Sequence, residues 1–546
     1  MLSVTETLGE SRDELLKIIG DLSSKNEEQS AIIHKLETQN EQLASKLHWF
    51  EEQFHLLRQK RFGKSSERTV PEQRRLFDEA EMIADQEPAK EPETQTIPSY
   101  TRKKVGRKPL PEDLPKERIV YDLPEQEQIC SECGERMHKM GEAVRQELVI
   151  IPAQAKVVEH VRCKYGCRNC ENNKKKADSP NEMPPVPIKI ASAPQPVISK
   201  SYASPSSISY VMTAKFVDGV PLYRQEKHLE RLGLLISRSV LSDWMLKGSA
   251  ILKPIYEAKQ EALIGREYLH ADETTLQVLK EPGRAAETKS YMWMYRTGRD
   301  NLPPIILYEY QKTRAGEHPR KFLSGFKGYL CVDGYAGYEG LERPEKTGDP
   351  QPVKLCACWA HFRRKADEAV KGLPPDKRKS GGRAREALDY INKLFAIERE
   401  LDKCTPEARR IEREKKSRPV VEELRKWLDG IRDEVLPKSL LGTVVTYGLN
   451  QWGKLTRFFE DGRIELTNNR AERSIKPFVI GRKNFLFCNT PGGANASAVI
   501  YSIIETAKEN GLNPYAYLTH LFERLPNIDK TNKEAIEALL PWNVKL

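Results

Sequence analysis

The sequence lacks the features that mark membrane and exported proteins. No apolar run approaches the roughly 20 residues that a helix needs to cross a bilayer. The first residues, Met1–Leu16, have neither the basic start nor the apolar stretch of a secretory signal. These absences predict a cytoplasmic protein that has no membrane partner.

A disulfide framework is also not expected. The chain has ten cysteines, and without an export signal these should be thiols, some of them metal ligands. With 546 residues, of which 38% are hydrophobic and 31% charged, the chain should form several globular domains joined by polar connectors. Its net charge of +10 permits nucleic-acid binding. For identifying a binding surface, where the positive charge lies along the chain is more informative than its sum.

A heptad repeat of apolar residues extends from about Ser30 to Lys60. With Ile33 at position a, the following a and d positions are Leu36, Asn40, Leu43, Leu47, Phe50, Phe54 and Leu57. A single Asn at an a position fixes the register and favours a parallel, two-stranded coiled coil. We therefore expect residues 1–68 to be a zipper-like coiled coil that joins at least two copies of the chain. A single amphipathic helix packed on its own protein is the alternative.

A flexible linker is expected at residues 69–115, where acidic residues and prolines precede a basic run. In that run, Thr101–Pro109, we take Arg107 and Lys108 as candidate DNA-binding residues. A Gly-Arg-Lys-Pro core can lie in an A·T-rich minor groove, which is narrow and electronegative. A solvated linker would have the same composition.

Two Cys-x-x-Cys pairs predict a zinc-binding domain at residues 116–185. Cys130 and Cys133 form the first pair, and Cys167 and Cys170 the second. Four thiolates in two close pairs suit structural, tetrahedral Zn²⁺ and leave no position open for catalysis. The alternative is a redox pair, but no thioredoxin-like context surrounds either motif. Cys163 is a spare cysteine that could replace Cys167.

A helix-turn-helix is predicted within residues 186–255. One helix covers Tyr223–Leu232, Gly233 breaks it, and Ser237 caps a second helix. The second helix should turn Val240, Leu241, Trp244 and Met245 inward. Its exposed residues near the N-terminus, Arg238, Ser239 and Ser242, should then face DNA. A generic helical hairpin is the alternative.

Residues 256–490 have the element order of a ribonuclease-H-like α/β domain. Strands are expected at 267–279, 290–296, 304–310, 328–335 and 353–359, with helices at 314–323, at about 335–341 and from His361 onward. In that fold the first and fourth strands are neighbours, so Asp272 and Asp333 should meet at one edge of the sheet. A helical insertion is expected at about residues 373–455, and a C-terminal helical domain at 491–546.

Two acids hold a pair of divalent ions poorly, so a third acid is expected downstream. The candidate is Glu472, on a helix that also presents Arg473 and Lys476 to phosphates. Three carboxylates suit two Mg²⁺ or Mn²⁺ ions, which can clamp the attacking and leaving oxygens of a phosphoryl displacement. Any one of these acids alone would more often be a solvated surface charge.

Four blocks of the sequence carry a family resemblance: His270–Thr274, Val332–Tyr338, Cys358–Arg364 and Asn468–Arg473. They are similar to the signature blocks of the insertion sequence 66 family of DDE transposases. The resemblance extends to the zipper, the cysteine pairs, the helix-turn-helix, the block Gly481–Phe487 and the C-terminal region. It implies the catalytic triad Asp272, Asp333 and Glu472. The resemblance also implies accessory proteins from the same element.

Cys358-x-x-His361 matches an element that often follows the second Asp in related transposases. We interpret His361 as a supporting residue near the site and not as a zinc ligand, because it has no partner pair.

The sequence thus predicts a bacterial transposase that binds terminal inverted repeats and target DNA. Cleavage would release a 3′-hydroxyl, which would then attack the target. Two alternatives remain, a catalytically silent DNA-binding regulator and a ribonuclease-H-like nuclease or resolvase.

Overall fold

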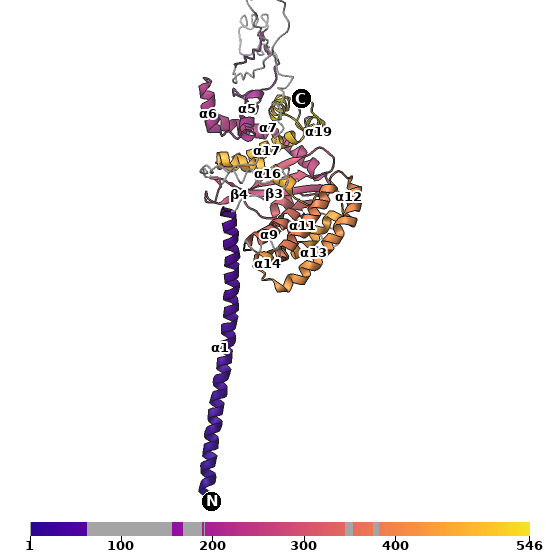
Figure 1. Cartoon of the computed structure of the whole chain (residues 1–546). Helices are drawn as coiled ribbons and strands as arrows, with labels where there is room; N and C mark the ends of the chain where they lie inside the picture. The colour runs from indigo at the N-terminus through magenta and orange to yellow at the C-terminus, as the bar shows by residue number, and fades with distance from the viewer. Residues whose placement is uncertain (1, 63–155, 167–187, 191, 344–352, 375–381) are drawn as a thin grey trace, which may run out of the picture. The chain divides into compact units, whose positions relative to one another are not determined.

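The computed structural model describes residues 2–62, 156–166, 188–190, 192–343, 353–374 and 382–546 (Figure 1). The chain divides into two compact units, one formed by Met1–Asp78 with Val161–Leu546 and the other by Glu79–His160. Among the described residues, no helix combines the length and the apolar character that crossing a membrane requires.

Several predicted binding residues lie outside the described part of the chain, namely Cys130, Cys133, Cys167, Cys170, Arg107 and Lys108. The spare cysteine, Cys163, is described and is exposed. It directly precedes β1 (Lys164–Gly166), which pairs antiparallel with β2 (Ile188–Ile190).

A five-stranded sheet carries the predicted acids. Its strands are β3 (Tyr268–Gln277), β4 (Lys289–Thr297), β5 (Ile306–Gln311), β6 (Gly328–Val332) and β7 (Val353–Ala357). They lie in the order β5-β4-β3-β6-β7. The first three pair antiparallel, and β6 and β7 continue the sheet parallel to β3. The five predicted strands, and the adjacency of the first and the fourth, are confirmed.

The helices between these strands also follow the predicted order. They are α8 (Glu317–Phe322), the 3₁₀ helix η2 (Ala336–Glu342) and α9 (Trp359–Gly372). Side chains of β4 alternate between two hydrophobic clusters, as the two-residue period of a strand requires. Met292 and Met294 face one cluster, and Trp293 and Tyr295 face the other. The sheet is therefore covered on both faces.

The first of these clusters joins the helices that precede the sheet to the sheet itself and to the C-terminal helices. It contains side chains from α5 (Pro205–Phe216), α7 (Arg238–Ile264), α16 (Asn469–Phe485), α17 (Pro491–Glu509) and α18 (Pro514–Arg524). α17 packs on β5 and on α7 (Figure 1). The chain ends with a 3₁₀ turn (Leu525–Asn527) and α19 (Lys533–Glu537).

The predicted helix, turn and helix are present as α6 (Leu222–Arg231) and α7. Gly233 has a φ of +81° between them, a value that a side chain disfavours. The Oγ of Ser237 accepts a hydrogen bond from the N–H of Val240 at 3.4 Å, so the predicted cap is confirmed. One inward assignment is wrong, because Val240 is 40% exposed while Leu241, Trp244 and Met245 are buried. Leu241, the next residue, is fully buried, so Val240 is exposed because it lies about 100° around the helix from the buried face.

The region between β7 and α16 is helical, as predicted. It contains α11 (Gly382–Glu400), α12 (Pro406–Glu412), a π-helical turn (Arg413–Ser417), α13 (Arg418–Ile431), α14 (Leu440–Asn450) and α15 (Trp452–Thr456), with short 3₁₀ turns at 432–434 and 457–459. Arg413 is fully buried and ties this region together. It forms an ion pair with Glu398 and donates to the carbonyls of Phe458 and Ile464 at 2.7 and 2.8 Å.

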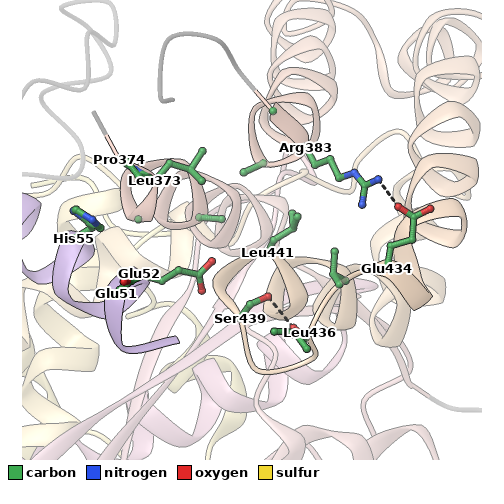
Figure 2. A pocket seen from close by; sticks show the side chains of 15 residues that line it. Glu51, Glu52, His55, Leu373, Pro374, Arg383, Glu434, Leu436, Ser439 and Leu441 are labelled. Carbon is green, nitrogen blue, oxygen red and sulfur yellow. Dashed lines mark hydrogen bonds and ion pairs between the residues drawn. The ribbon is translucent and has the colours of Figure 1, made fainter. Parts of the chain in front are cut away.

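The N-terminal helix α1 (Leu2–Phe62) contacts α9 and the start of α14 near its own C-terminal end. Leu56 is only 6% exposed, and a carboxylate oxygen of Glu52 accepts the N–H of Leu440 at 2.9 Å. Figure 2 shows Glu52 directed toward the loop of Ser439, beside a cavity of about 460 Å³. The a and d residues of the predicted zipper are exposed instead.

Candidate active site

Asp272 and Asp333 follow matched positions on neighbouring parallel strands. The pairing of β3 with β6 sets His270 opposite Cys331, and each acid lies two residues further along its chain. Residues two apart in a strand point to the same face. The sheet register therefore brings the two carboxylates to one place at the carboxyl ends of β3 and β6.

Glu472 completes this acidic cluster from the first turn of α16, which packs across β3. The pKa of Asp272 is raised well above its usual range, first by burial and then by the negative charges of Glu273, Asp333 and Glu472. Like charges raise a carboxyl pKa only when they are close. The three predicted acids thus share one site.

The cluster suits a hard divalent cation. Oε1 of Glu472 is buried and has no hydrogen-bond partner among the described residues. A buried carboxylate oxygen without a partner is costly unless a cation or a donor compensates it. Carboxylate oxygens are also the ligands that Mg²⁺ prefers. Asp272, Asp333 and Glu472 are therefore the residues that fit such an ion.

Asn468 connects three elements of the site and was not predicted. It is 1% exposed and lies at the start of α16. Its Nδ2 donates to the carbonyl of Ala271 at 2.8 Å, next to Asp272 in the chain. Its backbone N–H donates to the Sγ of Cys358 at 3.1 Å, directly before α9. Asn468 therefore fixes the start of the Glu472 helix against the strand of Asp272.

His270 extends this connection as a fully buried imidazole. Its Nδ1 lies 2.8 Å from Oδ1 of Asn468, and its Nε2 lies 3.2 Å from Oε2 of Glu465. Both partners present oxygen atoms, which can accept a hydrogen bond from the ring. Burial alone would raise the pKa of Glu465, but hydrogen bonds from His270 and Arg470 outweigh burial and hold that pKa well below its usual range.

Glu273 is fully engaged by neighbouring side chains and is not placed to bind a metal. One of its oxygens accepts Nε of Arg314 at 2.7 Å, and the other accepts the hydroxyl of Tyr338 at 2.5 Å. The guanidinium of Arg314 lies over the ring of Tyr335, 3.7 Å from its centroid, and its Nη2 lies 3.8 Å from Oδ2 of Asp333. Arg314 is thus a cation held at the rim of the acidic cluster.

His361 lies beside the cluster, as its predicted supporting role requires. Its Nε2 is 4.0 Å from Oε1 of Glu472, and its Nδ1 is buried without a partner among the described residues. Burial, followed by the charge of Arg364, lowers the pKa of His361. The sulfur of Cys358, an imidazole nitrogen of His361 and a carboxylate oxygen of Glu472 lie within 4.8 Å of one another. These three groups also have the spacing of metal ligands. From the sequence, His361 had not been interpreted as a ligand, because no partner pair of ligands was identified for it.

Where the structure describes them, the residues predicted to face DNA or its phosphates are exposed, with the exception of Lys476. Arg473 is exposed and Lys476 is half-buried, one residue and one turn after Glu472 on α16. Arg238, Ser239 and Ser242 are all exposed near the start of α7. The sequence did not identify Asn468, His270, Glu465 or Arg314. Asn468 lies inside the block Asn468–Arg473, and His270 lies inside the block His270–Thr274. Membership of these blocks was the one signal in the sequence that could have identified the two residues.

Comparison with known families gives four matches along the chain. A model described as the transposase IS66 family matches residues 200–496, more than half of the chain. The IS66 C-terminal element matches residues 502–542, and the zinc-finger binding domain of transposase IS66 matches 127–171. A fourth model, described as transposase C of IS166 homeodomain, matches residues 49–119. The family predicted from the sequence is thereby confirmed.

Similar proteins are found in Sinorhizobium fredii (strain NBRC 101917 / NGR234). Uncharacterized protein y4hP is 31% identical over 511 residues, which cover 90% of this chain and 87% of that protein. Uncharacterized protein y4jD is 31% identical over 442 residues, 80% of this chain and 81% of that protein. Their names carry no activity, so they support the extent of the likeness and not a function.

Proposed function

The chain belongs to the transposase IS66 family, and from this premise we propose that it binds the terminal inverted repeats of an insertion sequence and catalyses metal-dependent DNA cleavage and strand transfer. The observation that carries the proposal is the convergence of Asp272, Asp333 and Glu472, which are remote in sequence. Such a cluster, lined with cations, is typical of phosphoryl transfer on nucleic acids.

The fold that we propose for residues 256–490 is ribonuclease-H-like, with the helical region between β7 and α16 as an insertion. Support comes from the sheet order β5-β4-β3-β6-β7 and from its change from antiparallel to parallel pairing at β3. In this arrangement the acids on β3 and β6 lie at the point where the pairing changes. The other domain boundaries stay as predicted from the sequence.

In the proposed mechanism, Asp272, Asp333 and Glu472 would hold two Mg²⁺ or Mn²⁺ ions. Such a pair would supply charge stabilisation for a phosphoryl displacement. The protein contributes position and charge. Asn468 holds Glu472 close to Asp272, while Arg314 and Arg473 provide positive charge for a phosphate at the rim.

Zinc belongs to a separate, structural part of the proposal. The zinc-finger match at residues 127–171 contains the four predicted ligands Cys130, Cys133, Cys167 and Cys170. Four thiolates close the coordination sphere of Zn²⁺ and stabilise a small domain. We assign this ion no role in the reaction.

DNA recognition is proposed for the start of α7 and for the basic run that contains Arg107 and Lys108. The exposure of Arg238, Ser239 and Ser242 supports the first of these. The exposed heptad residues of α1 support a coiled-coil homodimer. Accessory proteins from the same element remain part of the family expectation.

The test is Mg²⁺-dependent cleavage of duplex DNA that carries the element's end. Native protein should nick this end, and Asp333→Asn should bind it without cleavage. Asp429→Asn, on the exposed surface of α13, provides the matched control for the loss of one negative charge. Equal cleavage by native protein and Asp333→Asn would remove Asp333 from the site. Cleavage of an RNA–DNA hybrid or a junction in preference to the end would favour the nuclease alternative.

A further inference from the structure

The helix that carries Glu472 ends in an exposed apolar turn. Leu486 directly follows α16 and is 66% exposed, and Phe487 is 43% exposed. Both belong to the block Gly481–Phe487, which the proposed chemistry does not use. Large apolar side chains that are exposed side by side are candidates for a binding surface.

The backbone at this turn is strained. Leu486 has φ +63° and ψ −50°, and the N–H of Phe487 donates to the carbonyl of Phe485 at 2.7 Å. These values describe a γ-turn of the rare positive-φ kind, which is unfavourable for a bulky residue. Glycine would be easier to place there. The fold therefore gains no backbone energy from leucine at position 486, and it buries only the smaller part of that side chain.

The turn is fixed on both sides. The N–H of Leu486 donates to the carbonyl of Arg482 at 2.6 Å, and the N–H of Cys488 donates to the carbonyl of Gln277 at 2.9 Å. The guanidinium of Arg482 contacts the Oγ1 of Thr275 at 3.0 Å on β3. The two apolar side chains thus project from a rigid support that is shared with the strand of Asp272.

A band of cationic and apolar side chains connects this turn to the acidic cluster. Arg473, Lys476, Ile480 and Lys483 recur at intervals of three or four residues on α16, so they lie along one face of the helix. Glu472 borders that face. The positive charges suit a nucleic-acid backbone and oppose a cationic partner. Continuity with the acidic cluster favours the DNA that is cut there over a second copy of the chain.

We propose that Leu486 and Phe487 form an apolar wedge that enters the base stack of the bound end DNA. The inference rests on the proposed DNA-cleaving function. Side chains that enter the stack unstack a base step and kink the duplex. Leu486 follows Glu472 by 14 residues, which is about 21 Å of helix. At about 3.4 Å per nucleotide, the wedge should act about six nucleotides from the phosphate at Glu472.

The experiment places 2-aminopurine at successive positions of the end DNA and measures its fluorescence with full-length protein. Ca²⁺ replaces Mg²⁺ so that binding is observed without cleavage, and anisotropy measures affinity in the same samples. Native protein should raise the fluorescence several-fold at one position about six nucleotides from the cleaved phosphate. The double variant Leu486→Gly with Phe487→Ala should abolish this rise. Leu302→Ala, which removes another exposed leucine (56% exposed) from the β4–β5 turn, should retain it.

Two further readouts separate a wedge from a merely structural residue. Leu486→Gly alone should unfold at the same temperature as native protein or higher, because it relieves the strained φ. An abasic site at the wedge position should tighten binding by native protein several-fold and leave the double variant unchanged, because no base then has to be unstacked.

The outcomes distinguish the wedge from the function on which it rests. If native protein neither binds nor cuts the end, the proposed function fails. If it binds and cuts without a fluorescence rise at any position, or if the double variant keeps the rise, the wedge is overturned and the function stands.

Discussion

Arg314 donates two hydrogen bonds to one carboxylate oxygen of Glu273, through Nε at 2.7 Å and through Nη2. The same Nη2 lies 3.8 Å from Oδ2 of Asp333. Glu273 follows Asp272 directly in the chain, so its role is to hold a cation beside the metal-binding acids. The block His270–Thr274 thus supplies one candidate metal ligand and one residue that positions an arginine.

We expect Arg314→Ala to lower kcat for end cleavage by about 10²-fold, with a smaller change in KM for DNA. The reason is the loss of a fixed positive charge where charge develops on the phosphate. Arg314→Lys should recover only part of the rate, because an ammonium does not reproduce the planar contacts of a guanidinium. Arg320→Ala, at an exposed arginine of α8, is the control. Native kcat in Arg314→Ala would place Arg314 outside the reaction.

Asn468→Ala should lower both stability and cleavage. It leaves Nδ1 of His270 and the carbonyl of Ala271 without their partners, which costs about 2–3 kcal/mol of unfolding free energy in a buried site. It also releases the start of α16, so kcat per folded molecule should fall. Denaturant unfolding and single-turnover cleavage measure the two effects. Asn495→Ala, at an exposed asparagine of α17, is the control, and a loss of stability alone would make Asn468 structural only.

The strands and the three acids could be predicted because their signals are local. Continuous runs of apolar and aromatic residues marked β4 and β5, and Asp272 and Asp333 each accompany a short apolar strand. Knowledge of the common strand order then made β3 and β6 neighbours. Glu472 was predicted because a pair of divalent ions needs a third carboxylate ligand and because the sequence around Glu472 indicated a helix that could present it.

The supporting network could not be predicted, because its contacts join residues that are far apart in the chain. His270 and Asn468 are separated by 198 positions. No period or spacing indicates that an imidazole and an amide this distant will meet. The burial of Val240 was wrongly predicted for another reason, since helical periodicity identifies an apolar face but does not fix the edge of that face, where Val240 lies beside the buried Leu241.

Glu309 on β5 predicts a pH-dependent contribution to stability. Burial raises its pKa to about 7, above the value of about 4.3 in an unfolded chain. At pH values between these two pKa values, Glu309 keeps its proton in the folded chain and loses it in the unfolded chain. The contribution of Glu309 to stability is therefore fully present below about pH 4 and is lost as the pH rises to about 7.

Glu309→Gln should accordingly raise the Tm at about pH 8 and have little effect at about pH 4. The expected gain in unfolding free energy is on the order of 1 kcal/mol. This is less than the full pKa shift implies, because the Glu309 side chain is only half-buried. Glu422→Gln changes the same charge on the exposed surface of α13 and should not depend on pH in this way. An equal Tm difference at both pH values would show that Glu309 is ionised throughout.

The residues of α1 divide into two sets with different expected partners. Leu56 packs against the helical region of the same chain, whereas the apolar a and d residues are each 56–64% exposed. A coiled-coil partner would bury the exposed set and leave the Leu56 contact in place.

Leu47→Glu should therefore weaken a dimer at least tenfold, because the change removes an apolar seam residue and sets two like charges opposite each other. Gln42→Glu, outside the seam, should not. Sedimentation of full-length protein measures the dimer, and thermal unfolding should stay native in both variants. A dimer that survives Leu47→Glu would exclude this seam as the interface. Dissociation caused by Leu56→Ala instead would mean that the two copies meet at the face of α1 that contacts α9.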